Sequence, residues 1–174
     1  MNKKYLKILG IIIAFFLCFP LHNLYKQFPN FVTSIIVPVN ESIWEHMKIL
    51  FGSILLSGII QKIIVIVKKE NKTNICFSNF VAAITSIPIF LIMFLPVYYY
   101  LGDNFGIIIL IMLVTIIIAE LISYQILKLP DLNLENITIV FVIIIYALFT
   151  YFTYYPLDME IFRAPIKLTY GIIK

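Results

Sequence analysis

Charged side chains are scarce in this sequence, at 13% of its 174 residues, whereas hydrophobic residues make up 62%. A soluble domain of similar length carries roughly 25% charged residues. The apolar residues also form long uninterrupted blocks, without the polar alternation of a water-soluble helix or strand. The low charge content therefore excludes an ordinary soluble domain and favours a lipid bilayer as the solvent of this chain.

Sequence patterns of several other functional classes are also absent. The net charge is only +4, and no aromatic-plus-basic platform or recognition-helix pattern is present, so we expect no nucleic-acid binding. The lysines stand at the ends of the apolar blocks, which suits anionic lipid headgroups. The two cysteines, Cys18 and Cys76, form no CxxC pattern and are interpreted as small packing residues. The expected partners are the lipid bilayer and, as an option, another membrane protein.

The apolar blocks predict an all-α, integral membrane helical bundle with about five transmembrane helices in one domain, residues 1–174. The predicted helices cover about residues 5–25, 42–67, 74–100, 105–127 and 136–155, followed by a tail over 156–174. The segment between the first two helices is unusually apolar, so we expect it to lie in the interface or to fold back onto the bundle. Ser42 and Glu45, three residues apart, have the form of a capping box at the start of the second helix.

The positions of the basic residues predict the orientation of the bundle, because cytoplasmic loops carry an excess of Lys and Arg. With the N-terminus inside, the cytoplasmic side holds Lys3, Lys4, Lys7, Lys68, Lys69, Lys72 and Lys128. The outer side holds Lys26, Lys48, Arg163, Lys167 and Lys174. The bias predicts a cytoplasmic N-terminus, an outer tail and a location in the plasma membrane.

Polar residues that could perform chemistry collect on the predicted outer side. This outer-face cluster consists of His22, Asn40, Glu41, Glu45, His46 and Arg163. Carboxylates and imidazoles at one membrane depth could bind a divalent metal or act as acid and base. The candidate metal ligands are His22, Glu41 and His46, while the catalytic residues and any cofactor stay unknown. Helix capping and an ion pair of Arg163 with Glu41 or Glu45 would instead make the cluster structural.

One ionisable residue, Glu120, lies inside a predicted membrane helix. A charge at such a depth costs roughly 2–3 kcal/mol unless it is paired or hydrated. Lys62 lies at a similar distance from the cytoplasmic boundary, so we predict an intramembrane ion pair between Lys62 and Glu120. A proton or cation pathway through Glu120 is the alternative.

Two stretches resemble a known family. The stretch from Pro38 to Lys48, Pro-Val-Asn-Glu-Ser-Ile-Trp-Glu-His-Met-Lys, resembles the signature of a family of small bacterial multi-pass membrane proteins classed as a domain of unknown function. The closing stretch, from Tyr155-Pro156 through Phe162-Arg163 and Pro165 to Tyr170-Gly171-Ile172, is similar to the C-terminus of that family. Ala164 and Leu157 depart from the family pattern, which tends to have Asp and Pro there. The resemblance implies a fold and a membrane location but no reaction.

These observations leave three functional hypotheses. The first is a binding or permeation protein, or an accessory subunit, with the outer-face cluster as its polar vestibule. The alternative is a membrane-embedded metal- or carboxylate-dependent enzyme of hydrolase type at the outer leaflet, which requires the cluster side chains to converge on one point. A third, structural hypothesis requires caps and ion pairs to satisfy every one of these groups. Whether His22, Glu45 and His46 meet in the folded protein discriminates among them.

Overall fold

Six α-helices and one short 3-10 helix make up the computed structural model, which describes residues 2–70, 73–102, 104–165 and 168–172. The elements are α1 (Lys3–Gln27), α2 (Phe31–Ile36), α3 (Ile43–Val67), α4 (Ile75–Leu101), α5 (Phe105–Leu127), α6 (Glu135–Tyr154) and η1 (Glu160–Phe162). Five of them, all except α2 and η1, are long and apolar enough to cross a membrane. The predicted all-α architecture with five spans is confirmed. Lys72, Lys167 and Lys174, used above to predict orientation, lie outside the described residues.

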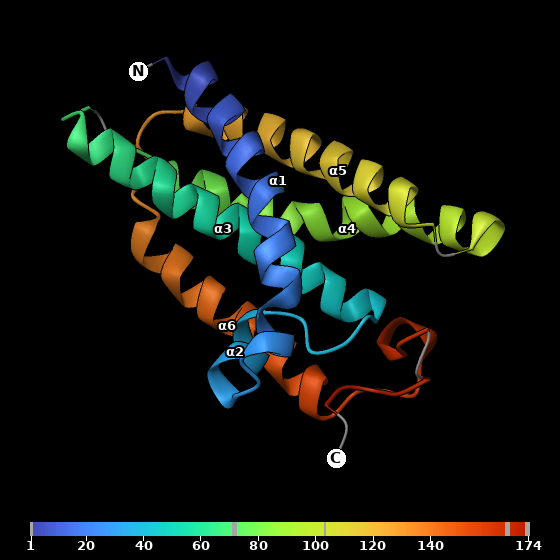
Figure 1. Ribbon diagram of the computed structural model, residues 1–174. Coiled ribbons are helices and arrows are strands. Elements are labelled where there is room, and N and C mark those ends of the chain that lie inside the picture. Colours follow the sequence, from blue (N-terminus) through green and yellow to red (C-terminus); the bar gives the residue numbers. More distant parts are fainter. Residues whose placement is uncertain (1, 71–72, 103, 166–167, 173–174) are drawn as a thin grey trace.

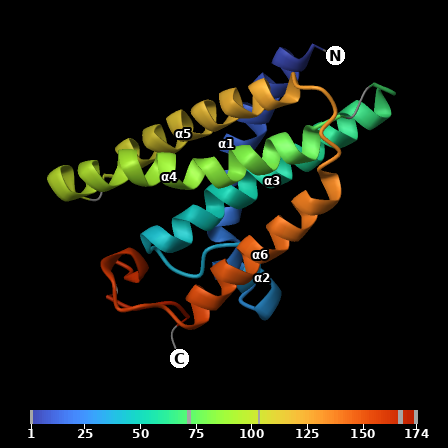
Figure 2. The same ribbon diagram turned by 180° about the vertical axis from the view of Figure 1, so that it is seen from behind.

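The helices α1, α3, α4 and α5 form the body of the bundle, and α6 lies at its side (Figures 1 and 2). Helix α3 is the most buried of the five long helices; it packs against α1 and α4 and also contacts α5 and η1. Helix α5 packs against α1 and α4. The shared core contains Phe51, Ile54, Phe90 and Ile116. Helix α6 exposes a row of large apolar side chains, such as Ile143, which suits contact with lipid tails.

Successive long helices run in opposite directions, so the bundle has two distinct ends (Figure 1). The amino-terminal end contains the start of α1, the α3–α4 connection and the α5–α6 connection. The tail end contains α2, the segment that joins α2 to α3, the far ends of α4 and α5, and the residues after α6. The α4–α5 hairpin diverges from α6 at the tail end (Figure 2).

The apolar segment between the first two spans folds into the short helix α2. Asn30 caps it, since its side chain accepts a hydrogen bond from the Thr33 N–H while the Thr33 hydroxyl accepts one from the Asn30 N–H. Helix α2 lies against the end of α6, where the Ser34 and Tyr154 hydroxyls are 2.9 Å apart. The segment therefore returns to the bundle and braces the tail end.

Candidate functional site

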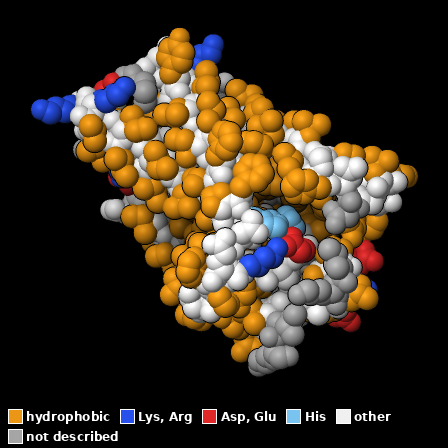
Figure 3. Space-filling view, viewed as in Figure 1, with side chains coloured by type: hydrophobic (Ala, Val, Ile, Leu, Met, Phe, Trp, Pro, Cys, Tyr) orange, Lys and Arg blue, Asp and Glu red, His pale blue; other side chains and the backbone are white. Residues whose placement is uncertain are grey.

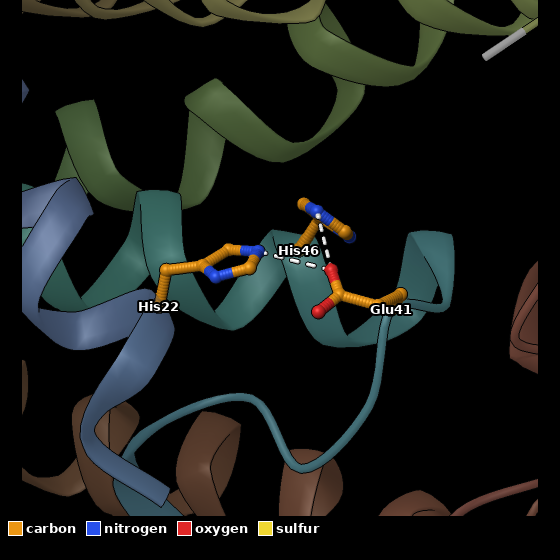
Figure 4. A group of neighbouring side chains, drawn as sticks. All are labelled: His22, Glu41 and His46. Carbon is orange, nitrogen blue, oxygen red and sulfur yellow. Dashed lines mark ion pairs between the residues drawn. The ribbon is translucent and has the colours of Figure 1, made fainter. Parts of the chain in front are cut away.

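Glu41 lies at the centre of a cluster of nitrogen-bearing side chains at the tail end (Figure 4). His22 Nε2 is 3.0 Å from Glu41 Oε2, and His46 Nε2 is 3.8 Å from the same oxygen. The two imidazole rings have their centroids 5.5 Å apart. Lys26 Nζ donates to the other carboxylate oxygen, Oε1, at 2.6 Å. Both histidines thus converge on one carboxylate, which the sequence alone left open.

Three different segments bring these side chains together. His22 lies in the last part of α1, Glu41 in the segment before α3, and His46 in the first turn of α3. The start of α3 is fixed by Ser42, whose side chain accepts a hydrogen bond from the Glu45 N–H at 3.3 Å. His46 Nδ1 lies 2.9 Å from the Ser42 carbonyl oxygen, so it must carry a proton and donate. Nε2 is then the ring nitrogen of His46 that faces Glu41 Oε2.

Asn40 fixes the segment that carries Glu41. Its side-chain oxygen accepts a hydrogen bond from the Ser42 N–H at 2.8 Å, and its amide donates to the Gly171 carbonyl at 3.0 Å. The second contact ties the tail to the start of α3. Asn40 is therefore a positioning residue for Glu41.

The surroundings of Glu41 stabilise its charged form. The hydrogen bond from His22 is the largest cause that lowers the pKa of the Glu41 carboxyl, and Lys26 adds to it, while partial burial opposes the change. The resulting pKa is about 2. Glu41 is therefore a carboxylate at neutral pH, which is the form that can bind a cation.

Glu45 does not take part in this cluster. Its buried carboxylate forms an ion pair with Lys48, with Nζ–Oε2 at 2.9 Å, and accepts hydrogen bonds from the Thr153 hydroxyl at 2.7 Å and the Val39 N–H at 3.1 Å. The predicted capping box is thus half formed, since Ser42 caps the helix while the Glu45 side chain binds the N–H of Val39. The carboxylate links α3 to α6 and to the preceding segment, so its role is structural.

Arg163 lies in the tail, where its backbone forms a bridge with Tyr170. Its side chain is exposed and lies on the wall of the cavity described below. Within the described part of the chain, the ion-pair partners of Glu41 and Glu45 are histidines and lysines, not Arg163. The expected pairing of Arg163 with either carboxylate is therefore absent from the described contacts.

The predicted Lys62–Glu120 ion pair is wrong. Lys62 Nζ contacts Glu135 at 3.1 Å, whereas Glu120 Oε2 contacts Lys7 Nζ at 3.2 Å. Adjacent helical residues point about 100° apart, so Gln61, not Lys62, is directed at Glu120, with its Nε2 3.4 Å from Oε1. The prediction used only the similar membrane depth of Lys62 and Glu120, and depth does not specify on which face of α3 a side chain lies.

Glu120 instead belongs to a buried polar network formed by Lys7, Gln61, Asn79 and Glu120. Lys7 Nζ and Gln61 Nε2 both donate to Asn79 Oδ1, at 3.0 and 3.3 Å. The network joins α1, α3, α4 and α5, and it is close-packed, because a Cβ added at Gly10 would collide with the Gln61 amide. Lys7 was not predicted as the partner of Glu120, because it was grouped with the lysines that indicate the cytoplasmic side of the bundle.

A cavity of about 970 Å³ opens beside the Glu41 cluster. Its walls come from α1, α3, α4, α5 and the tail, and most of the lining side chains are apolar, including Phe15, Phe94 and Met112. The lining also includes the side chains of His22, Glu41 and His46. In the space-filling view, the histidines lie in a hollow beside acidic and basic atoms, with hydrophobic surface on the bundle side (Figure 3). The site thus combines an apolar chamber with an ionisable wall.

Comparisons with known proteins identify one relationship. No curated protein and no solved structure matches the chain. A family model, described as a family of unknown function, matches residues 1–172 and confirms the resemblance to such a family. The chain belongs to this family, DUF6512.

Proposed function

We propose that this membrane protein binds a lipid-like amphiphile in the cavity at its tail end. The main support for this proposal is the cavity itself. Its walls are mostly apolar, and they also include the ionisable side chains of Glu41, His22 and His46. Ligand sites typically have volumes of roughly 300–1,000 Å³, apolar walls and a few placed polar groups. The apolar part of the ligand would lie against residues such as Phe94 and Met112, with its polar head at Glu41.

The proposal includes an orientation with the tail end outside, in the plasma membrane. The basic residues of the amino-terminal end support it, since Lys3, Lys4, Lys68, Lys69 and Lys128 all lie at that end. The cavity would then receive its ligand at the outer leaflet or from the exterior.

Cysteine labelling tests this orientation. In a background without Cys18 and Cys76, a Lys69→Cys variant should react with an impermeant maleimide only after the membrane is opened, and a Tyr100→Cys variant should react in intact cells. Tyr100 suits the test because it is 87% exposed at the far end of α4. The opposite labelling pattern would refute the orientation.

A cavity-filling substitution tests ligand binding. Met112 lines the cavity from α5, so Met112→Trp should fill part of the chamber and reduce the amount of lysophospholipid or fatty acid retained by the purified protein in native mass spectrometry. Leu110→Trp is the matched control, because Leu110 lies on the same helix but is 59% exposed on the bundle surface. Equal retention by both variants would refute the cavity as the binding site.

A membrane-embedded hydrolase is the second candidate function. Two imidazoles and a carboxylate on the cavity wall favour it, because such groups can activate water for attack on an ester. Turnover of a lysophospholipid by the wild-type protein, abolished in His46→Ala, would favour the enzyme over the binding protein. Retention of the lipid without turnover would favour binding alone.

A further inference from the structure

The three side chains around Glu41 form a donor set for a metal ion. One donor atom each from His22, Glu41 and His46 lies within 4.8 Å of the other two. Two imidazole nitrogens and one carboxylate oxygen are a common protein donor set for zinc in sites that keep one position open. All three residues are half-buried, so water and ions can reach them.

The distances among the donor atoms are close to those that a bound ion requires. Ligands about 2.0–2.1 Å from a tetrahedral zinc ion are about 3.3 Å from one another. Glu41 Oε2 is 3.0 Å from His22 Nε2 and 3.8 Å from His46 Nε2. Small side-chain rotations would therefore be sufficient to place the three atoms around one ion.

The hydrogen bond of His46 is an independent observation that points to a ligand. Metal-binding histidines almost always donate their second ring N–H to a carbonyl or carboxylate, which fixes the tautomer and the ring orientation. His46 makes this contact through Nδ1 to the Ser42 carbonyl at 2.9 Å. The backbone at the start of α3 thereby orients the ring so that Nε2, the atom that would bind the ion, faces Glu41.

His22 needs one change before it can act as a ligand. Its Nε2 carries a proton and donates a hydrogen bond to Glu41 Oε2. When neutral His22 moves that proton to Nδ1, Nε2 becomes a lone-pair donor and Glu41 Oε2 becomes free for the ion. Lys26 keeps its contact with the other oxygen, Oε1, and so holds the carboxylate in place.

We propose that His22, Glu41 and His46 bind one divalent first-row transition metal ion, with Zn²⁺ as the best match. The fourth position faces the cavity, where water or the head of a ligand completes the coordination. The imidazoles select against Mg²⁺ and Ca²⁺, which prefer all-oxygen sites. This proposal does not depend on the amphiphile, because the ion can bind without it.

Direct titration tests the metal site. Untagged, chelator-treated protein in detergent is titrated with Zn²⁺ by calorimetry, and bound metal is counted by elemental analysis after desalting. We expect one Zn²⁺ per chain and at least about a 100-fold loss of affinity in His22→Ala, Glu41→Gln and His46→Ala, since even outer-shell changes cost 10–100-fold. Mg²⁺ at the same concentration should neither bind nor compete.

Asn23→Ala is the matched control, because Asn23 lines the same cavity beside His22 but hydrogen-bonds to the Phe19 carbonyl of its own helix. It should retain wild-type zinc affinity. Size-exclusion profiles identify any variant that fails to fold, and His46→Gln replaces His46→Ala if that variant aggregates. Absence of zinc binding to folded wild-type protein, or equal binding by the wild type and all three ligand variants, would refute the site. Loss of lipid retention in Met112→Trp with zinc binding intact would separate this proposal from the proposed function.

Discussion

The Glu41 cluster and the buried polar network both place nitrogen-bearing side chains around a carboxylate, yet their surroundings differ. In the buried network, the Lys7 and Glu120 side chains are 5% and 0% exposed, and amide groups from α3 and α4 contact them. In the Glu41 cluster, the carboxylate is 32% exposed and lines a cavity. The buried network is closed to solvent and joins four helices, whereas the Glu41 cluster opens to the cavity in which we propose that a ligand binds.

Because the two regions differ in burial, we expect the loss of a carboxylate to change the free energy of unfolding by very different amounts in each. Removing one partner of a buried ion pair typically costs 3–5 kcal/mol, because the other charge stays buried without compensation. An ion pair near solvent contributes roughly 0–1 kcal/mol. Stability measurements can therefore distinguish the two regions.

The largest expected effect is at Glu120. Glu120→Gln preserves the shape of the side chain but leaves the Lys7 ammonium buried without its counter-charge, so we expect a loss of about 3–5 kcal/mol and a clearly lower Tm in detergent. The control is Glu135→Gln, which removes the partner of Lys62 at a half-exposed site and should change Tm little. Equal effects of the two variants would contradict a structural role for the buried network.

A smaller effect is expected at Gly10. A methyl group there would collide with the Gln61 amide, so Gly10→Ala should displace the network and cost about 1–3 kcal/mol. Gly106→Ala is the matched control, because the position has room for a Cβ near the start of α5 and alanine favours helix. The measurement is Tm for both variants. A Gly10→Ala variant as stable as Gly106→Ala would mean that the network is loosely packed.

The smallest stability effect is expected at Glu41. Glu41→Gln removes the contacts to His22 and Lys26, but these lie near solvent, so the loss should be below about 1 kcal/mol. Thermal unfolding in detergent measures it. A loss as large as that of Glu120→Gln would make the Glu41 cluster a structural element and remove the basis of the comparison.

The sequence predicted the helices well because membrane spans depend on composition and length. It also brought His22, Glu41 and His46 into one candidate set from membrane depth alone. It could not assign partners for Glu45, Lys62 and Glu120, because a partner depends on the rotation of each helix about its axis.

Helix α2 was missed for a related reason. Its six residues are too few for a periodic pattern, and its position depends on contacts with α6. Lys7 was missed because a lysine near the N-terminus has the same sequence signal whether it faces the cytoplasm or a buried carboxylate. Its partner became visible only once α1 and α5 were packed together.

The most direct measurement compares Tm with and without Zn²⁺ for the wild type, Glu41→Gln and Glu120→Gln. Both substitutions replace a carboxylate with an amide of the same shape. A ligand that binds only the folded protein raises Tm. We predict that Glu120→Gln lowers Tm but retains the zinc-dependent rise, whereas Glu41→Gln keeps a near-normal Tm and loses the rise. A zinc-dependent rise that survives in Glu41→Gln, or disappears in folded Glu120→Gln, would contradict the assignment of binding to one region and structure to the other.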